Sequence, residues 1–190
     1  MKAISYSILS SIGLFGLLIT SSCSSPEIAH IQQVSTSPGQ SDGSLADRIH
    51  RDVNSYRASK GRAALARHKG LDAIAQKHCN RLAAKIGNKE LDRKDANHEG
   101  FEGRSLIALR VYRIPTLGEN VVTSANHSSK HLVDLWSKSK NHDFNMCSDW
   151  TYTGIGTATT PGGLVVSTQV FGTAPVSARD AAASRYGQGF

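Results

Sequence analysis

The chain has 190 residues, with 22 basic and 15 acidic side chains, a formal charge of +7 and 39% hydrophobic residues. The basic residues are scattered and no block of five or six like charges occurs, so the charge does not indicate a nucleic-acid partner. The hydrophobic content is higher than that of disordered chains. Roughly 140 residues remain after a targeting segment, which is enough for one domain with its own core.

Residues 1–22 are typical of a secretory signal peptide. One lysine precedes an apolar run that is dense over residues 12–19, shorter than the about 20 apolar residues that span a bilayer. Small residues surround Cys23 as in a bacterial lipobox, although Thr20 stands where that pattern has an aliphatic residue. We expect export and lipidation of Cys23, which would anchor the protein to a membrane. The alternative is that Cys23 is lost with an ordinary signal peptide.

The composition divides the rest of the chain into three parts. Residues 23–43 are rich in Ser, Gln, Pro and Gly and predict a flexible linker. The folded domain is predicted over residues 44–173, and residues 174–190 read as a weakly ordered tail. Ser44 with Asp47 three residues later predicts a helix N-cap, and the apolar spacing that follows predicts a helix that closes at Lys60-Gly61.

A second amphipathic helix is predicted over residues 71–86, where apolar residues recur at helical spacing. His78 and Cys79 both lie on its apolar stripe. We interpret His78 as a hydrogen-bonded core histidine rather than a ligand. Cys79 and Cys147 leave two alternatives open, a disulfide in an oxidising compartment or two free thiols, because sequence does not fix the distance between them.

The middle of the chain contains the polar residues that could form a functional site. Residues 88–104 predict a long loop containing His98, a short helix is expected over 105–112, and LGENVV, residues 117–122, predicts an extended segment with Glu119 at its start. A third helix is predicted over residues 127–138, followed by a loop over 137–150 that contains His142.

The C-terminal part predicts an antiparallel hairpin. Two segments rich in β-branched residues, 152–160 and 163–173, flank the turn Pro161-Gly162-Gly163. Helices that precede such a hairpin indicate an α+β fold.

Three polar side chains next to apolar structure form the candidate site: His98, Glu119 and His142. Imidazole and carboxylate groups suit zinc or another divalent cation. The same groups could instead form a hydrogen-bonded network that holds loops together, because a buried carboxylate has to be paired. The HSSKH segment lacks the glutamate of a zinc-protease HExxH motif, and no nucleophile elbow indicates a serine hydrolase.

The order NSYRASKGRAAL, NHEGF, LGENVV, LVDLWSKSKNH, GIGTA and STQVFG resembles the CAP superfamily of cysteine-rich secretory proteins, insect venom antigens and plant pathogenesis-related proteins, over about residues 44–172. The resemblance implies a three-layer α-β-α sandwich with a central cleft. In eukaryotic members two histidines and two glutamates line that cleft. His98 and Glu119 match one of each, whereas Ser139 and Val166 occupy the other two positions. His142 matches a histidine of the bacterial branch, the SCP-like extracellular domain.

These observations favour an exported, lipid-anchored binding module, monomeric, whose ligand is an unidentified small molecule, lipid or glycan. Its cleft is predicted to contain His98, Glu119 and His142, with zinc or another divalent cation as the candidate cofactor. A metal-assisted hydrolase, with Glu119 or a histidine as general base, is one alternative. A structural envelope protein, in which the three side chains only stabilise the fold, is the other.

Overall fold

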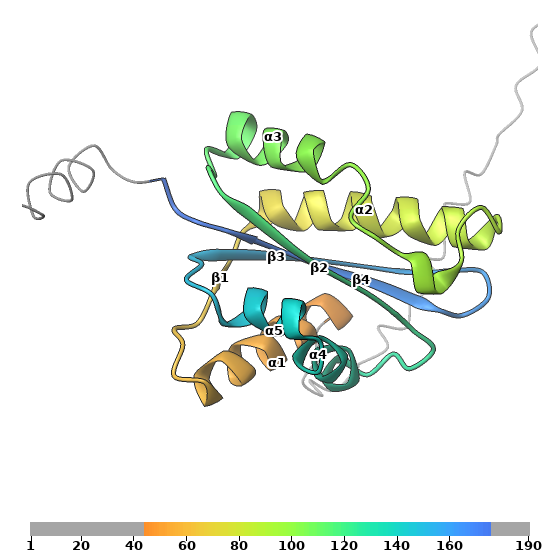
Figure 1. Ribbon diagram of the computed structural model, residues 1–190, viewed down its shortest axis with the longest axis horizontal. Helices are drawn as coiled ribbons and strands as arrows, with labels where there is room; N and C mark the ends of the chain where they lie inside the picture. Colours follow the sequence, from red (N-terminus) through yellow and green to blue (C-terminus); the bar gives the residue numbers. More distant parts are fainter. Residues whose placement is uncertain (1–43, 176–190) are drawn as a thin grey trace, which may run out of the picture. The chain divides into compact units, whose positions relative to one another are not determined.

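The computed structural model describes residues 44–175. The predicted signal peptide and the predicted linker with Cys23 lie outside the described residues, as does the predicted tail from residue 176 onward. Figure 1 shows the elements in chain order: α1 (Leu45–Ser59), β1 (Ala66–Arg67), α2 (Lys69–Gly87), a 3-10 turn (Arg93–Asp95), α3 (Phe101–Tyr112), β2 (Leu117–Ser124), α4 (Ser129–Ser137), α5 (Lys140–Cys147), β3 (Tyr152–Thr159) and β4 (Val165–Gly172). Within residues 44–175, no helix has the length and apolar character that crossing a bilayer requires.

The strands form one sheet in the order β1-β3-β4-β2. The predicted hairpin is present, because β3 and β4 pair antiparallel with Ile155 opposite Gln169. Strand β2 joins the other side of β4 antiparallel and places Glu119 opposite Val170. The two-residue strand β1 pairs parallel with β3 and was not predicted.

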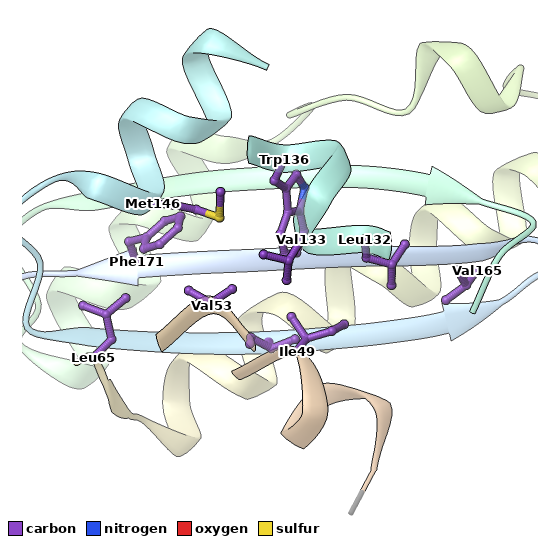
Figure 2. Close-up of a cluster of buried hydrophobic side chains, with 10 residues drawn as sticks. Ile49, Val53, Leu65, Leu132, Val133, Trp136, Met146, Val165 and Phe171 are labelled. Atoms are coloured by element: carbon purple, nitrogen blue, oxygen red, sulfur yellow. The ribbon is translucent and has the colours of Figure 1, made fainter. Parts of the chain in front are cut away.

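Helices cover both faces of the sheet, which confirms the predicted α+β fold with three layers. Helices α2 and α3 lie on one face, and α1, α4 and α5 lie on the other (Figure 1). The larger core cluster lies between the sheet and the second group; Figure 2 shows Met146 beside Phe171 of β4, and it also draws Trp136 of α4 with Ile49 and Val53 of α1. Each of these five side chains is fully buried.

Helix α2 packs directly on glycines of β3. A Cβ atom at Gly154 would lie 2.1 Å from the backbone carbon of Leu71, and one at Gly156 would lie 2.4 Å from that of Ala75. Leu71 and Ala75 are one helical turn apart, and the two glycines are two residues apart on one face of the strand. The helix backbone therefore rests on the strand backbone, and this fixes the distance between the two layers.

The helix predictions were right for most of the chain, but α3 begins at Phe101, inside the loop predicted over residues 88–104, and one helix was missed. Ser44 caps α1 in a capping box, accepting from the Asp47 amide at 3.2 Å while the Asp47 carboxylate accepts from the Ser44 amide at 3.0 Å. The loop predicted over residues 137–150 is wrong, because residues 140–147 form α5. Only Met146 of α5 is buried, so this helix has no apolar stripe for sequence analysis to detect.

Candidate functional site

Glu119 lies on β2 with its side chain turned toward α2 and α3. Side chains alternate along a strand, so Glu119 and Val121 share a face, and Val121 belongs to the cluster around Leu82 of α2. Glu119 is 5% exposed. A carboxylate this deeply buried has to be compensated.

The compensating charge is Arg104 of α3, which sequence analysis missed. Its Nε donates to Oε2 of Glu119 at 2.7 Å and its Nη2 donates to Oε1 at 2.7 Å, a bidentate ion pair. The Arg104 guanidinium also donates to the backbone oxygen of Glu99 at 2.9 Å. A signal was present in the sequence, since Arg104, Ala108 and Tyr112 repeat every four residues and form the inward side of α3.

Two histidines complete the surroundings of the carboxylate. The Nδ1–H group of His98 donates to Oε1 of Glu119 at 2.8 Å, and the His98 side chain is 49% exposed, so it forms the solvent-facing side of the network. His78 of α2 lies on the buried side of the carboxylate, and its Nε2 is 3.8 Å from Oε1 of Glu119. His78 Nε2 donates to the backbone oxygen of Asn97 at 2.9 Å, which agrees with its interpretation as a hydrogen-bonded core histidine.

His142 lies on the other side of β2 and reaches Glu119 only through the backbone. Asn120 donates to the backbone oxygen of His142 at 3.0 Å, and Asn145 donates to the backbone oxygen of Glu119 at 3.2 Å. Burial lowers the pKa of His142, and the charge of His98 lowers it further. Within residues 44–175, no hydrogen bond or ion pair joins the His142 ring to the Glu119 carboxylate.

The environment keeps Glu119 ionised. Burial alone raises its pKa, but the hydrogen bonds from His98 and Arg104, with the positive charge of Arg104, outweigh burial, and the net pKa is lowered. A carboxylate with a lowered pKa is a weak base at neutral pH. The group therefore suits charge pairing better than proton transfer.

The same contacts bear on the predicted metal ligands His98, Glu119 and His142. Both carboxylate oxygens of Glu119 already accept hydrogen bonds from a permanent cation, which competes directly with a metal ion. The other two positions of the CAP pattern supply no imidazole or carboxylate, because they hold Ser139, at the N-cap of α5, and the aliphatic Val166. Among residues 44–175, no group of three or more His, Cys, Asp or Glu residues could hold a metal ion. These donors do not fit a divalent cation.

Mild acidification should destabilise the fold through His78 and His142. Burial lowers the pKa of His78 and of His142 from the ordinary value of 6.5, so below pH 6.5 the unfolded chain binds more protons than the folded one. As the pH falls below 6.5, the free energy of unfolding should decrease by up to about 1.4 kcal/mol per pH unit for each histidine. Urea unfolding at pH 7.5, 6.5 and 5.5 measures this.

The variant His78→Gln separates the contribution of that residue. Glutamine keeps an N–H donor for the backbone oxygen of Asn97 but does not titrate, so the slope of stability against pH should decrease. His131→Gln, on α4 at the other face of the sheet, is the control for exchanging a histidine for a glutamine. An equal slope in the wild-type protein and His78→Gln would contradict the assignment.

Comparison with known proteins gives the family and the fold. The family model described as the cysteine-rich secretory protein family (CAP) matches residues 50–171. No protein in the curated set matches the sequence. Among solved structures, an outer surface protein from Borrelia burgdorferi superposes with a TM-score of 0.53 at 16% identity, covering 68% of this chain and 92% of that one.

Two other solved structures are similar over part of their length. One is an extracellular protein containing an SCP domain from Bacillus anthracis, with a TM-score of 0.53 at 16% identity over 68% of this chain and 40% of that one. The other is a cysteine-rich secretory protein from Staphylococcus aureus, with a TM-score of 0.53 at 17% identity over 72% of this chain and 41% of that one. At these identities the likeness shows the fold alone.

Proposed function

We propose that this chain, which belongs to the cysteine-rich secretory protein (CAP) family, is an exported binding module. The solved relatives are described as outer surface, extracellular or secretory proteins, and residues 1–22 have the pattern of a signal peptide. Its ligand belongs to the cell envelope or the extracellular space and contacts the half-exposed His98, and His142, on the other side of β2, is a second candidate contact.

The hydrogen bonding and the lowered pKa of Glu119 favour a binding function over hydrolysis. A general base needs a free lone pair and a pKa near the working pH. Both oxygens of Glu119 are already hydrogen-bonded, to Arg104 and His98, and its pKa is lowered. The Nδ1–H of His98 is likewise engaged, which leaves its half-exposed Nε2 to exchange a hydrogen bond with a polar ligand.

We further propose that Cys23 is acylated and that residues 23–43 link the lipid anchor to the domain. The support is the small-residue context of Cys23 directly after the apolar run. Labelling with a palmitate analogue in the producing cell tests this, and an unlabelled mature protein would argue for secretion without an anchor.

Co-sedimentation with purified cell-wall sacculi tests the binding role. We expect the exported chain to pellet with the sacculi, and His98→Gln to bind about tenfold more weakly, the loss of roughly one polar contact. Glutamine can still donate to Glu119, so melting should change little. His131→Gln on the opposite face is the matched control.

Other outcomes favour the alternatives. Release of soluble fragments from the sacculi during incubation would support the hydrolase. A large drop in melting temperature of His98→Gln with undiminished binding would support the structural role. Failure of the wild-type protein to pellet would exclude the cell wall as the source of the ligand.

A further inference from the structure

Strand β3 forms the edge of the sheet that lies farthest from the candidate site on β2. Strand β1 pairs with only the first two residues of β3, so most of this eight-residue strand has no neighbouring strand on its outer side. Alternate residues of such a strand point their N–H and C=O groups outward. The C=O of Thr153 accepts from the His68 amide next to β1 at 2.9 Å, so the outward residues that follow are Ile155 and Thr157.

Gln76 of α2 takes the place of a neighbouring strand at Thr157. Its Nε2 donates to the backbone oxygen of Thr157 at 2.8 Å, and its Oε1 accepts from the Thr157 amide at 3.1 Å. A side-chain amide has the same donor and acceptor as a peptide group, so this pair reproduces the two hydrogen bonds that an antiparallel strand makes with one residue. Gln76 Nε2 also donates to Oδ1 of Asn80 at 2.8 Å, which holds the amide in this orientation.

Asp72 and Arg67 occupy the outward groups of Ile155. Asp72 Oδ1 accepts from the Ile155 amide at 2.8 Å, and Arg67 Nη2 donates to the Ile155 backbone oxygen at 3.4 Å. Arg67 Nε also donates to Asp72 Oδ1 at 2.5 Å, so the two side chains form one ion-paired unit. All four outward backbone groups of Ile155 and Thr157 are therefore hydrogen-bonded to side chains.

The spacing of α2 matches the spacing of this edge. Asp72 and Gln76 are one helical turn apart, a rise of about 6 Å. Ile155 and Thr157 are two strand residues apart, about 7 Å. The β3 glycines on which α2 rests bring the helix backbone so near that side chains as short as Asp and Gln reach the strand.

The partner that an uncovered β3 edge would accept is a second copy of this chain. Residues 151–160, TYTGIGTATT, contain no charged residue and no proline, which are the residues that usually prevent pairing at an edge. In an antiparallel pair of two copies centred on Thr157, a twofold axis places each Thr157 opposite the other. Each backbone then offers its N–H and C=O to the same groups of its copy.

We propose that Asp72 and Gln76 block strand addition at β3 and prevent two copies of this chain from pairing edge to edge. They occupy the hydrogen-bonding groups that the second copy needs, on the one strand edge of the described domain that is uncharged and extends past its neighbour. The device is independent of ligand binding at His98, because the two features lie on opposite edges of the sheet.

Sedimentation velocity of the exported chain over a range of concentrations tests the proposal. Gln76→Ala removes the amide while alanine favours the helix, and its average mass should rise with concentration toward twice that of the wild-type protein. Lys77→Ala, at the neighbouring exposed position of α2, is the matched control and should sediment like the wild type. Gln76→Lys removes the same amide but places a charge at the edge, so it should stay monomeric.

Hydrogen exchange of the Thr157 amide locates the contact. In dilute Gln76→Ala this amide should exchange about tenfold faster than in the wild type, because it has lost its hydrogen bond to Gln76. At concentrations where the dimer forms, its protection should return. The amide of Gly156, which points toward β4 by the same alternation, is the internal control and should not change.

Three results overturn the proposal. The first is a Gln76→Ala protein that stays monomeric at every concentration although its Thr157 amide exchanges faster. The second is association of Gln76→Lys as strong as that of Gln76→Ala, since the contact would then not be the uncharged edge. The third is a Gln76→Ala dimer in which the Thr157 amide stays unprotected. If a thermal melt shows that Gln76→Ala does not fold, Gln76→Asn, whose shorter side chain does not reach Thr157, replaces it with the same expected results.

Discussion

Replacing Arg104 by alanine is expected to lower the free energy of unfolding by about 3–5 kcal/mol, the cost of leaving a buried charge unpaired. Glu119 would keep the hydrogen bond from His98 but lose both 2.7 Å contacts to the guanidinium. Arg104 also donates to the backbone oxygens of Glu99 and His98, so its loss should loosen the segment that leads into α3. Urea denaturation at pH 7.5 measures the change.

The controls isolate the buried charge. Arg62→Ala removes a surface pair with Asp149, whose side chains are 45% and 92% exposed, and should cost less than about 1 kcal/mol. The double variant Arg104→Ala with Glu119→Gln should recover part of the stability, because no unpaired charge remains. If Arg104→Ala costs no more than Arg62→Ala, the ion pair does not stabilise the fold.

Replacing Gly154 by alanine is expected to cost about 3 kcal/mol or more, at the upper end of the range for overpacked sites. The added Cβ would lie 2.1 Å from the backbone carbon of Leu71 and 2.3 Å from the backbone nitrogen of Asp72. Backbone atoms cannot rotate away as a side chain can, so relief requires α2 to move off the sheet. Such a shift also strains the Asp72 side chain, which accepts from the Ile155 amide at 2.8 Å.

Gly162→Ala is the control, because it adds the same methyl group at a site with space for it. The nearest atom to its added Cβ is Thr160 Oγ1 at 3.9 Å, so the change should stay within about 0.5 kcal/mol. Thermal and urea unfolding of both variants give the difference. Equal stabilities for the two variants would mean that α2 does not rest on β3 as described.

Elements with strong periodicity or defined caps were predicted well. The capping box at Ser44, the apolar stripe of α2 and the β3–β4 turn each had a local sequence signal. Helix α5 and strand β1 had no local sequence signal. Helix α5 buries only Met146, and β1 has two residues whose extended form depends on pairing with β3.

The candidate site was predicted only in part, because some of its contacts depend on how the helices pack. His98 and Glu119 were expected to meet, and their side chains lie 2.8 Å apart. Arg104 was missed although it repeats with Ala108 and Tyr112 on one side of α3, because a basic residue next to a polar segment usually lies on the surface. The buried carboxylate of Glu119 indicates that a cationic side chain must lie beside it. The carboxylate does not indicate which residue provides that cation.

The two thiols of the domain lie on opposite sides of the sheet, Cys79 on α2 and Cys147 on α5, and both are free. Burial raises the pKa of Cys79 to about 12, so its sulfur stays protonated and inert toward oxidants. The sheet separates the pair, and they cannot join without global opening. No disulfide therefore stabilises the folded state of residues 44–175, and its persistence outside a reducing cytosol depends on packing and on buried ion pairs.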